Sequence, residues 1–401
     1  MLRVYLDQKD FSRIAKGRSG VLDCTEDAAV SDLLEELVNQ GQIRIYFSWA
    51  HVVEALRYQQ DQLPLLEPYC DLVDKLTGGH CVRFPLELER LELELALAKR
   101  FGFPTDLDQR EYPYGRYATA VGLFPSPDLE LKDQLLRDLQ EYLDALPLRE
   151  KEKKRLRRKL RKEGTVRRLL NSLPDGQLSK LAVTLPSTPG FYTRQNVTDL
   201  LLGTPAVRAA KTVELLDGVF TFKNLITHYS QSFPELAKIG GFFDEDSWRL
   251  GELIRGLQLA QSVVGESFIR ERETEINLTN RFVDYLEPRI LDYSGKHGFS
   301  AQEAKTFLVE SRLRPVPALG VAVALVRAYS ARHKGELGKS RKPLDSDIMD
   351  LQHLRNLPYV DFQVTDRFMA DVAQDASMPF GTKVLRNLSE LKEELSRRIT
   401  G

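Results

Sequence analysis

Two short strand-like runs, one near each end of the chain, both lead directly into an aspartate. Residues 3–6 read Arg-Val-Tyr-Leu and precede Asp7, while residues 359–365 alternate apolar and polar side chains and precede Asp366. β-Branched and aromatic content in the first run, and period-two alternation in the second, predict β-strands. Because a strand needs partners in a sheet, the simplest fold joins the two ends of the chain in one domain.

The segments around these runs alternate between strand and helix patterns. Residues 30–40 carry apolar side chains at helical spacing and precede Gly41, which favours the end of a helix. Residues 43–47 form a second strand pattern, and Ser48 is a suitable N-cap for the helix that follows. Residues 346–356 predict another helix, shortly before the C-terminal strand. This alternation predicts an α/β fold.

The middle of the chain has a different pattern, with helical periodicity almost throughout from about residue 84 to residue 334. The full length of 401 residues exceeds what one hydrophobic core usually covers, which favours two domains. We therefore predict a discontinuous α/β domain made of residues 1–74 and 342–401. Residues 75–341 are predicted to form a large, mostly α-helical inserted domain.

The composition is that of an ordinary soluble protein. Apolar residues make up 42%, charged residues 29%, and the net charge is −1, so the overall charge indicates no particular partner. Three cysteines without a CxxC pair argue against disulfides and against a zinc cluster. There is no apolar region of a signal peptide, and the longest apolar stretch, within residues 317–328, is too short to span a membrane. We expect a cytoplasmic protein without a membrane partner; its oligomeric state stays open.

Four acidic residues occupy comparable places in this predicted fold. Asp7 and Asp366 end strands, Glu54 lies two turns into the helix after the second strand, and Asp347 begins a helix. In open parallel sheets, ligands bind at the carboxyl ends of the strands, where the following helices also begin. Clustered carboxylates suit Mg²⁺ or Mn²⁺, which activate water for phosphodiester hydrolysis. Taken singly, each acid is more often a helix cap or a turn residue.

Four segments resemble the acidic motifs of PIN-domain-like nucleases. They read Val-Tyr-Leu-Asp at residues 4–7, Ser-Trp-Ala-His-Val-Val-Glu at 48–54, Asp-Ser-Asp-Ile-Met-Asp at 345–350 and Leu-Pro-Tyr-Val-Asp-Phe-Gln-Val-Thr-Asp at 357–366. The resemblance implies an α/β/α sandwich with a parallel sheet formed by both chain ends. It also implies hydrolysis of nucleic acid, most often RNA, with Mg²⁺ or Mn²⁺ as cofactor.

The resemblance assigns catalytic roles to four acids, which are Asp7, Glu54, Asp347 and Asp366. The expected metal ligands are these four together with Asp350, which lies about one helical turn beyond Asp347. Asp345 and Asp350 compete with Asp347 for its role. Glu54 and Asp347 are 293 positions apart, whereas ordinary PIN domains have a short connection there. An insertion at a surface loop is compatible with an intact site.

Two histidines lie close in sequence to the expected ligands. His51 is three positions before Glu54, and His353 is three positions after Asp350, so each shares a helix face with an acid. His353 is positioned to hydrogen-bond to Asp350. For each histidine, a packing role is more frequent than a catalytic one.

The most basic part of the chain is residues 149–168, where twelve Lys or Arg and three Glu give a local charge of +9. Such a segment favours sequence-independent contact with phosphate groups. The predicted nucleic-acid-binding residues are Lys154, Arg155, Arg157, Arg158, Lys159, Arg161 and Lys162. The alternative is a charged surface helix paired with the acidic residues 86–94.

Together these observations predict a metal-dependent endonuclease that acts on nucleic acid, with RNA favoured over DNA. The helical insertion would position the substrate or bind a protein partner. The alternative is a catalytically inactive PIN-like scaffold that serves as a nucleic-acid or protein binding module. Metal binding at the acids discriminates between the two hypotheses.

Overall fold

The computed structural model divides the chain into two compact units. The larger unit combines Met1–Ala120 with Leu225–Gly401, and the smaller unit is Val121–Asn224. The structure describes residues 1–20, 25–57, 63–105, 107, 111–116, 153, 167, 193–204, 207–208, 211, 221–226, 271–333, 346–376 and 380–400. In the smaller unit these include helix α11 (Arg194–Leu202), which Thr193 caps by accepting a hydrogen bond from the Asn196 amide.

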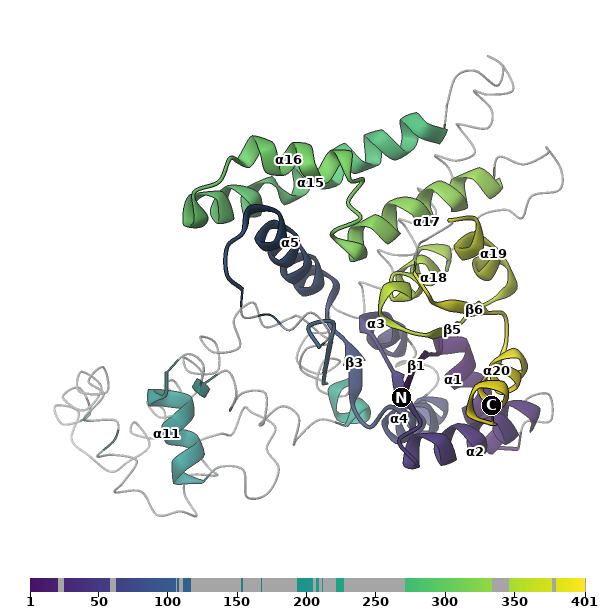
Figure 1. The fold of residues 1–401 in the computed structure, drawn as a ribbon. Helices are drawn as coiled ribbons and strands as arrows, with labels where there is room; N and C mark the ends of the chain where they lie inside the picture. Colours follow the sequence, from purple (N-terminus) through teal and green to yellow (C-terminus); the bar gives the residue numbers. More distant parts are fainter. Residues whose placement is uncertain are drawn as a thin grey trace. The chain divides into compact units, whose positions relative to one another are not determined.

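A parallel sheet of four strands, drawn from both ends of the chain, lies at the centre of the larger unit (Figure 1). Its order is β2-β1-β5-β6, with β1 at Leu2–Tyr5, β2 at Ile43–Tyr46, β5 at Phe362–Val364 and β6 at Lys383–Leu385. In register, Val4 lies between Ile45 and Phe362. The predicted α/β class and the predicted union of the two ends in one sheet are both confirmed.

Strand β1 lies in the interior of the sheet because its side chains are mostly apolar. Val4, Tyr5 and the following Leu6 are fully buried. A parallel sheet covered on both faces requires such near-continuous apolar runs, because neither face of the strand reaches water. The strand pairs with β2 on one side and with β5 on the other, so it joins the N-terminal and C-terminal parts of the sheet.

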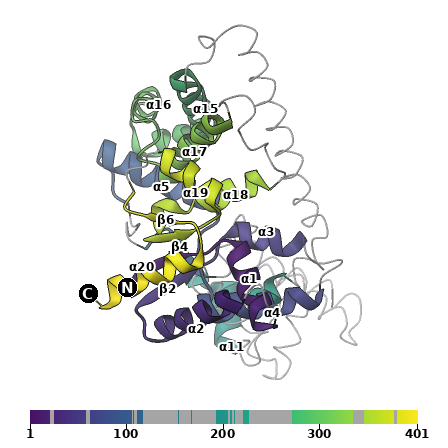
Figure 2. The same cartoon turned by 90° about the vertical axis from the view of Figure 1, so that its right-hand side faces the viewer.

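Helices lie on both sides of the sheet (Figures 1 and 2). On one side, α2 (Thr25–Asn39) contacts β2, and α20 (Leu388–Thr400) contacts β5 and β6. The same layer includes α1 (Gln8–Arg18) and α4 (Leu63–Thr77), which both contact α2. On the other side, α19 (Arg367–Asp375) contacts β6, and α18 (Asp347–Leu354) contacts both α19 and α3 (Trp49–Arg57). This layering is compatible with an α/β/α arrangement.

Four further helices of the larger unit come from the region that the sequence assigned to the insertion. They are α5 (Pro85–Phe101), α15 (Glu271–His297), α16 (Ala301–Glu310) and α17 (Pro317–His333). They share one apolar core, in which Leu97, Leu286 and Leu308 are fully buried. The same region also contains two antiparallel strands that helical periodicity did not indicate, β3 (His80–Val82) and β4 (Tyr114–Arg116). Among the residues that the structure describes, none of the helices has the length and apolarity needed to cross a membrane.

Glu92 of α5 is a buried acid that is hydrogen-bonded to residues of two other elements. Its carboxylate accepts hydrogen bonds from the hydroxyls of Tyr359 and Tyr112 and, at 2.8 Å, from the amide of Ala318. Tyr359 belongs to the short helix η2 (Leu357–Tyr359), and Ala318 belongs to α17. Burial raises the pKa of Glu92 to about 7, although the three donors favour its charged form.

This shift predicts how stability depends on pH. Between about 4.5 and 7 the folded chain retains a proton on Glu92 that the unfolded chain has released, so the free energy of unfolding falls as pH rises through this window. The contribution is roughly 3 kcal/mol at most. Glu92→Gln cannot titrate, so the stability of wild type relative to this variant should decline from pH 4.5 to pH 8. Urea denaturation across that range measures the difference, and a difference that stays constant or grows with pH would contradict it.

Candidate functional site

The carboxyl ends of two neighbouring strands each carry an aspartate that begins a helix. Asp7 follows β1 and caps α1, accepting a hydrogen bond from the Asp10 amide at 3.2 Å. Asp366 follows β5 and caps α19, accepting from the Met369 amide at 3.0 Å. Because β1 and β5 are paired, these two N-caps lie on the same edge of the sheet. Each aspartate therefore both starts a helix and faces the edge at which parallel sheets bind ligands.

Two more acids reach this edge from helices α3 and α18, which contact each other. Glu54 comes from α3 and Asp350 from α18. Together with Asp7 and Asp366 they line a cleft of about 350 Å³. The other residues that line the cleft are Gln8, Lys9, Ser12, Arg13, Lys16, Ser346 and His353. The structure thus brings together four of the five acids that the sequence proposed as ligands.

Asp347 is the acid that does not line this cleft. It is 1% exposed, and its carboxylate accepts a hydrogen bond of 2.6 Å from the Tyr329 hydroxyl of α17. Asp350, one helical turn later, lines the cleft where Asp347 was expected. Of the two acids of α18 that the sequence predicted as ligands, Asp350 therefore lines the cleft and Asp347 does not. Asp345 lies outside the described residues, and so do all seven predicted nucleic-acid-binding residues at positions 154–162.

The acids of the cleft disfavour one another's charge. Burial raises the pKa of Asp7 to about 6, and the nearby Glu54 carboxylate contributes to the shift. Burial also raises the pKa of Asp350 to about 7, with further contributions from Asp7, Glu54 and Asp366. Asp7 and Asp350 therefore bind protons readily, and for the same reason they favour a bound cation.

A basic helix face borders the acids. Lys9, Arg13 and Lys16 follow one another at helical spacing along α1, and all three line the cleft. Arg13 pairs with Asp27 at 2.8 Å, whereas Lys9 and Lys16 are exposed to solvent. The cleft therefore has an acidic wall and a cationic border. The acidic wall suits a metal cation, and the cationic border suits a negatively charged ligand bound next to that cation.

Behind Glu54 lies a hydrogen-bonded network that the sequence did not reveal. His353 Nε2 is 2.7 Å from Glu54 Oε2, and His353 Nδ1 is 2.7 Å from the Tyr5 hydroxyl. The Tyr5 hydroxyl in turn is 2.6 Å from Ser48 Oγ. Burial lowers the pKa of His353, but the carboxylates of Glu54, Asp7 and Asp350 together outweigh burial, so the pKa is raised overall. The sequence suggested Asp350 as the partner of His353, whereas the direct partner is Glu54.

His51 has a packing role, as the sequence favoured. Its Nδ1 accepts the amide hydrogen of Ser48 at 3.1 Å, and its Nε2 donates to the carbonyl of Leu6 at 2.9 Å. Burial and the neighbouring His353 lower its pKa well below the usual range. A neutral ring with both nitrogens engaged fixes the start of α3 against the end of β1.

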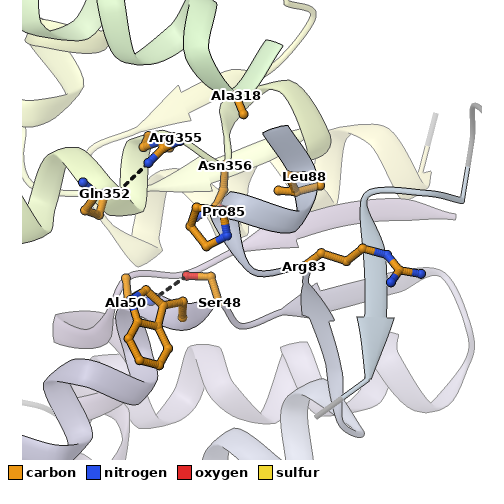
Figure 3. A pocket seen from close by; sticks show the side chains of 10 residues that line it. Ser48, Ala50, Arg83, Pro85, Leu88, Ala318, Gln352, Arg355 and Asn356 are labelled. Atoms are coloured by element: carbon orange, nitrogen blue, oxygen red, sulfur yellow. Dashed lines mark hydrogen bonds between the residues drawn. The ribbon is translucent and has the colours of Figure 1, made fainter. Parts of the chain in front are cut away.

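A second pocket, much smaller, is lined by residues of α3, α5, α17 and α18 and of the segments next to them (Figure 3). Its volume of about 20 Å³ suits a single water molecule rather than a nucleotide. Arg355 and Ser48 both line it, and Arg355 is paired with Glu89 at 2.7 Å. Figure 3 shows Ser48 beside Ala50, whose amide donates to the Ser48 hydroxyl at 3.3 Å. Ser48 therefore belongs both to this pocket and to the network behind Glu54.

The chemistry of the donor set fits a hard divalent cation, because four carboxylates from four elements line one cleft. In the part of the chain that the structure describes, however, no three His, Cys, Asp or Glu side chains stand close enough together to form a ready-made metal site. A cation would have to draw the carboxylates together. Comparison with models of protein families, with curated proteins and with solved structures finds no match to this chain.

Proposed function

We propose that this protein is a metal-dependent nuclease with a PIN-like core, which hydrolyses phosphodiester bonds of nucleic acid, RNA in preference to DNA. The observation that carries the proposal is the cleft at the edge of the parallel sheet, which Asp7, Glu54, Asp350 and Asp366 line. These four residues are the ligands that we assign to Mg²⁺ or Mn²⁺. A bound cation of this kind supplies activated water and stabilises the charge that develops at phosphorus.

The remaining residues of the cleft supply binding and orientation. Lys9 and Lys16 present charge at the rim, where they attract a phosphate backbone. The caps formed by Asp7 and Asp366 hold two of the carboxylates on rigid helix starts. No nucleophilic serine or cysteine is required, since water is the attacking group. The polyanionic substrate is therefore held along the cationic border while the acids act at one phosphate.

The direct test is cleavage of labelled single-stranded RNA and DNA with Mn²⁺, with Mg²⁺ and with EDTA. We expect cleavage with Mn²⁺, none in EDTA, and a higher rate on RNA. Asp7→Asn and Asp366→Asn should abolish it without unfolding the protein, because asparagine caps a helix as well as aspartate does. Cleavage that persists in EDTA, or full activity in both variants, would show that the proposal is wrong.

Binding of a divalent cation should also raise the thermal stability of the protein. Since Asp7 and Asp350 have pKa values of about 6 and 7, their carboxylates are charged at pH 8 and largely protonated at pH 5. A cation that binds only the folded chain raises its unfolding temperature. Millimolar Mg²⁺ or Mn²⁺ should therefore raise the melting temperature at pH 8 and have much less effect at pH 5. An equal shift at both pH values, or in Asp350→Asn, would point to non-specific binding.

One observation favours a second candidate, a binding module without hydrolysis. The carboxylates do not form a ready-made metal site among the described residues. In that case the protein would bind an oligonucleotide with strong salt dependence, and the affinity would be unchanged by Asp7→Asn and Asp366→Asn. Fluorescence anisotropy with a labelled oligonucleotide, with and without Mn²⁺, distinguishes this candidate from the nuclease.

A further inference from the structure

Two side chains from different elements hold the carboxylate of Glu54. His353 of α18 contacts Glu54 Oε2 at 2.7 Å. Gln8 of α1, with its amide nitrogen facing the carboxylate, donates to Oε1 at 3.0 Å and to Oε2 at 2.8 Å. Gln8 and His353 are both buried, at 7% and 1% exposure. Both oxygens of Glu54 are therefore engaged before any substrate arrives.

The ring of His353 is fixed in its turn by a hydroxyl on the central strand. Tyr5 lies in β1 and is fully buried, and its hydroxyl is 2.7 Å from His353 Nδ1. That hydroxyl is also 2.6 Å from Ser48 Oγ, which is anchored at the start of α3 by the Ala50 amide. Three residues that are distant in the sequence thus form one chain of hydrogen bonds that ends at the acid in the cleft.

Packing alone does not account for the Tyr5 hydroxyl. The interior of β1 needs only an apolar ring at this place, and phenylalanine would fill it without a polar group to satisfy. Burying the hydroxyl costs free energy unless it is hydrogen-bonded, and here it has partners in Ser48 Oγ and His353 Nδ1, with His51 Nδ1 farther away at 3.3 Å. A fully satisfied buried network of this kind is rigid, and it fixes the orientation of the group at its end.

We propose that His353 is a positioning residue for the reaction, which holds Glu54 in the orientation that binds metal, and that Tyr5 and Ser48 fix the His353 ring for this purpose. The inference rests on the proposed nuclease function. His353 itself is not assigned contact with the substrate. Its Nε2–H donates to Glu54, and the contact of Nδ1 with Tyr5 determines how the ring is turned.

The geometry predicts a specific effect on kinetics. Partners that orient a metal ligand typically account for about 10–100-fold in metal affinity or activity. Tyr5→Phe removes one oxygen and leaves the packing of β1 in place, so it should lower kcat by roughly 10-fold at saturating Mn²⁺ with little change in KM. A merely structural role for Tyr5 would lower the melting temperature without this selective loss of kcat.

A matched pair of substitutions at His353 separates the hydrogen bond to Glu54 from the loss of the ring. In Gln the amide nitrogen occupies the place of Nε2, so His353→Gln keeps a donor to Glu54 and should retain most of the activity. In Asn the amide nitrogen occupies the place of Nδ1, so His353→Asn should lose activity as severely as His353→Leu. His297→Gln, an exposed histidine on α15, is the control and should behave as wild type. Equal activity of the Gln and Asn variants would overturn the inference.

A spectroscopic measurement tests the contact without relying on catalysis. In ¹⁵N-histidine-labelled protein, the His353 Nε2–H should give a hydrogen-bonded signal that moves in Glu54→Gln and in Tyr5→Phe. If wild type cleaves no nucleic acid with either metal, the proposed function fails. The changes in the ¹⁵N signal still test whether His353 is hydrogen-bonded to Glu54. If wild type is active but the signal is unchanged in both variants, the positioning inference fails and the proposed function stands.

Discussion

Asp350→Asn should lower the Mn²⁺-supported cleavage rate by more than roughly 100-fold. The loss of a residue that only orients a metal ligand costs up to about 100-fold, whereas this substitution removes a proposed ligand itself. Asp350 lines the cleft beside Asp7, Glu54 and Asp366, and asparagine cannot supply a charged oxygen there. Single-turnover cleavage of a labelled RNA at saturating metal measures the loss in the chemical step.

Asp347→Asn is the internal control, since it makes the same chemical change one helical turn away. Asp347 accepts a hydrogen bond from Tyr329, and the amide oxygen of asparagine can accept it as well. We expect activity close to that of wild type and at most a modest loss of stability. If Asp347→Asn abolished cleavage and Asp350→Asn did not, the assignment of the site to Asp350 would be wrong.

The same Asp350→Asn replacement should stabilise the protein when no divalent cation is present. Asp350 has a pKa of about 7 in the folded chain against an ordinary value of 3.8, so its ionisation at pH 8 disfavours folding by a few kcal/mol, at most about 4. The neutral amide removes this cost. Urea denaturation in EDTA should therefore show a higher free energy of unfolding for the variant at pH 8.

Two comparisons make this second prediction specific. The stabilisation of Asp350→Asn relative to wild type should become smaller as pH falls from about 7 toward 4. Over this range the Asp350 carboxyl of the folded wild type becomes protonated and neutral, like the amide of the variant. The stabilisation should also shrink when Mg²⁺ is added, since the cation stabilises only the wild-type set of carboxylates. Asp284→Asn, an exposed acid on α15, should change stability very little under any of these conditions. A destabilised Asp350→Asn in EDTA would contradict the view that the acids repel one another.

Local patterns were sufficient to predict three strands of the sheet and to place Asp7, Glu54 and Asp366 at its edge. The run before Asp7 and the run before Asp366 are buried strands, and both acids lie at the same sheet edge because parallel strands end there. Glu54 followed from the helix after the second strand. These predictions depend on short-range periodicity and on a general rule of parallel sheets, so they need no knowledge of distant contacts.

The choice between Asp347 and Asp350 could not be made from local pattern. Both acids lie near the start of one helix, about one turn apart, so spacing alone assigns them to neighbouring faces. What decides is Tyr329, which belongs to another helix and binds Asp347. The network behind Glu54 was missed for a similar reason. Tyr5 appears as one more apolar residue of a strand, and its partner His353 is 348 positions away.

The interleaving of β1 between β2 and β5 has a consequence for the order in which the molecule forms. The amide of Arg3 donates to the side chain of Asp361, 358 positions later. During synthesis, one edge of β1 therefore stays unpaired until that later part of the chain has been made. Contacts of such long sequence separation form slowly, and the unpaired edge is exposed to association with other chains until then. Two of the four acids, Asp350 and Asp366, arrive in that same late part. A nascent polypeptide that has not yet reached Asp366 therefore lacks two of the four acids that line the cleft, so the proposed nuclease site cannot form before that part of the chain has been made.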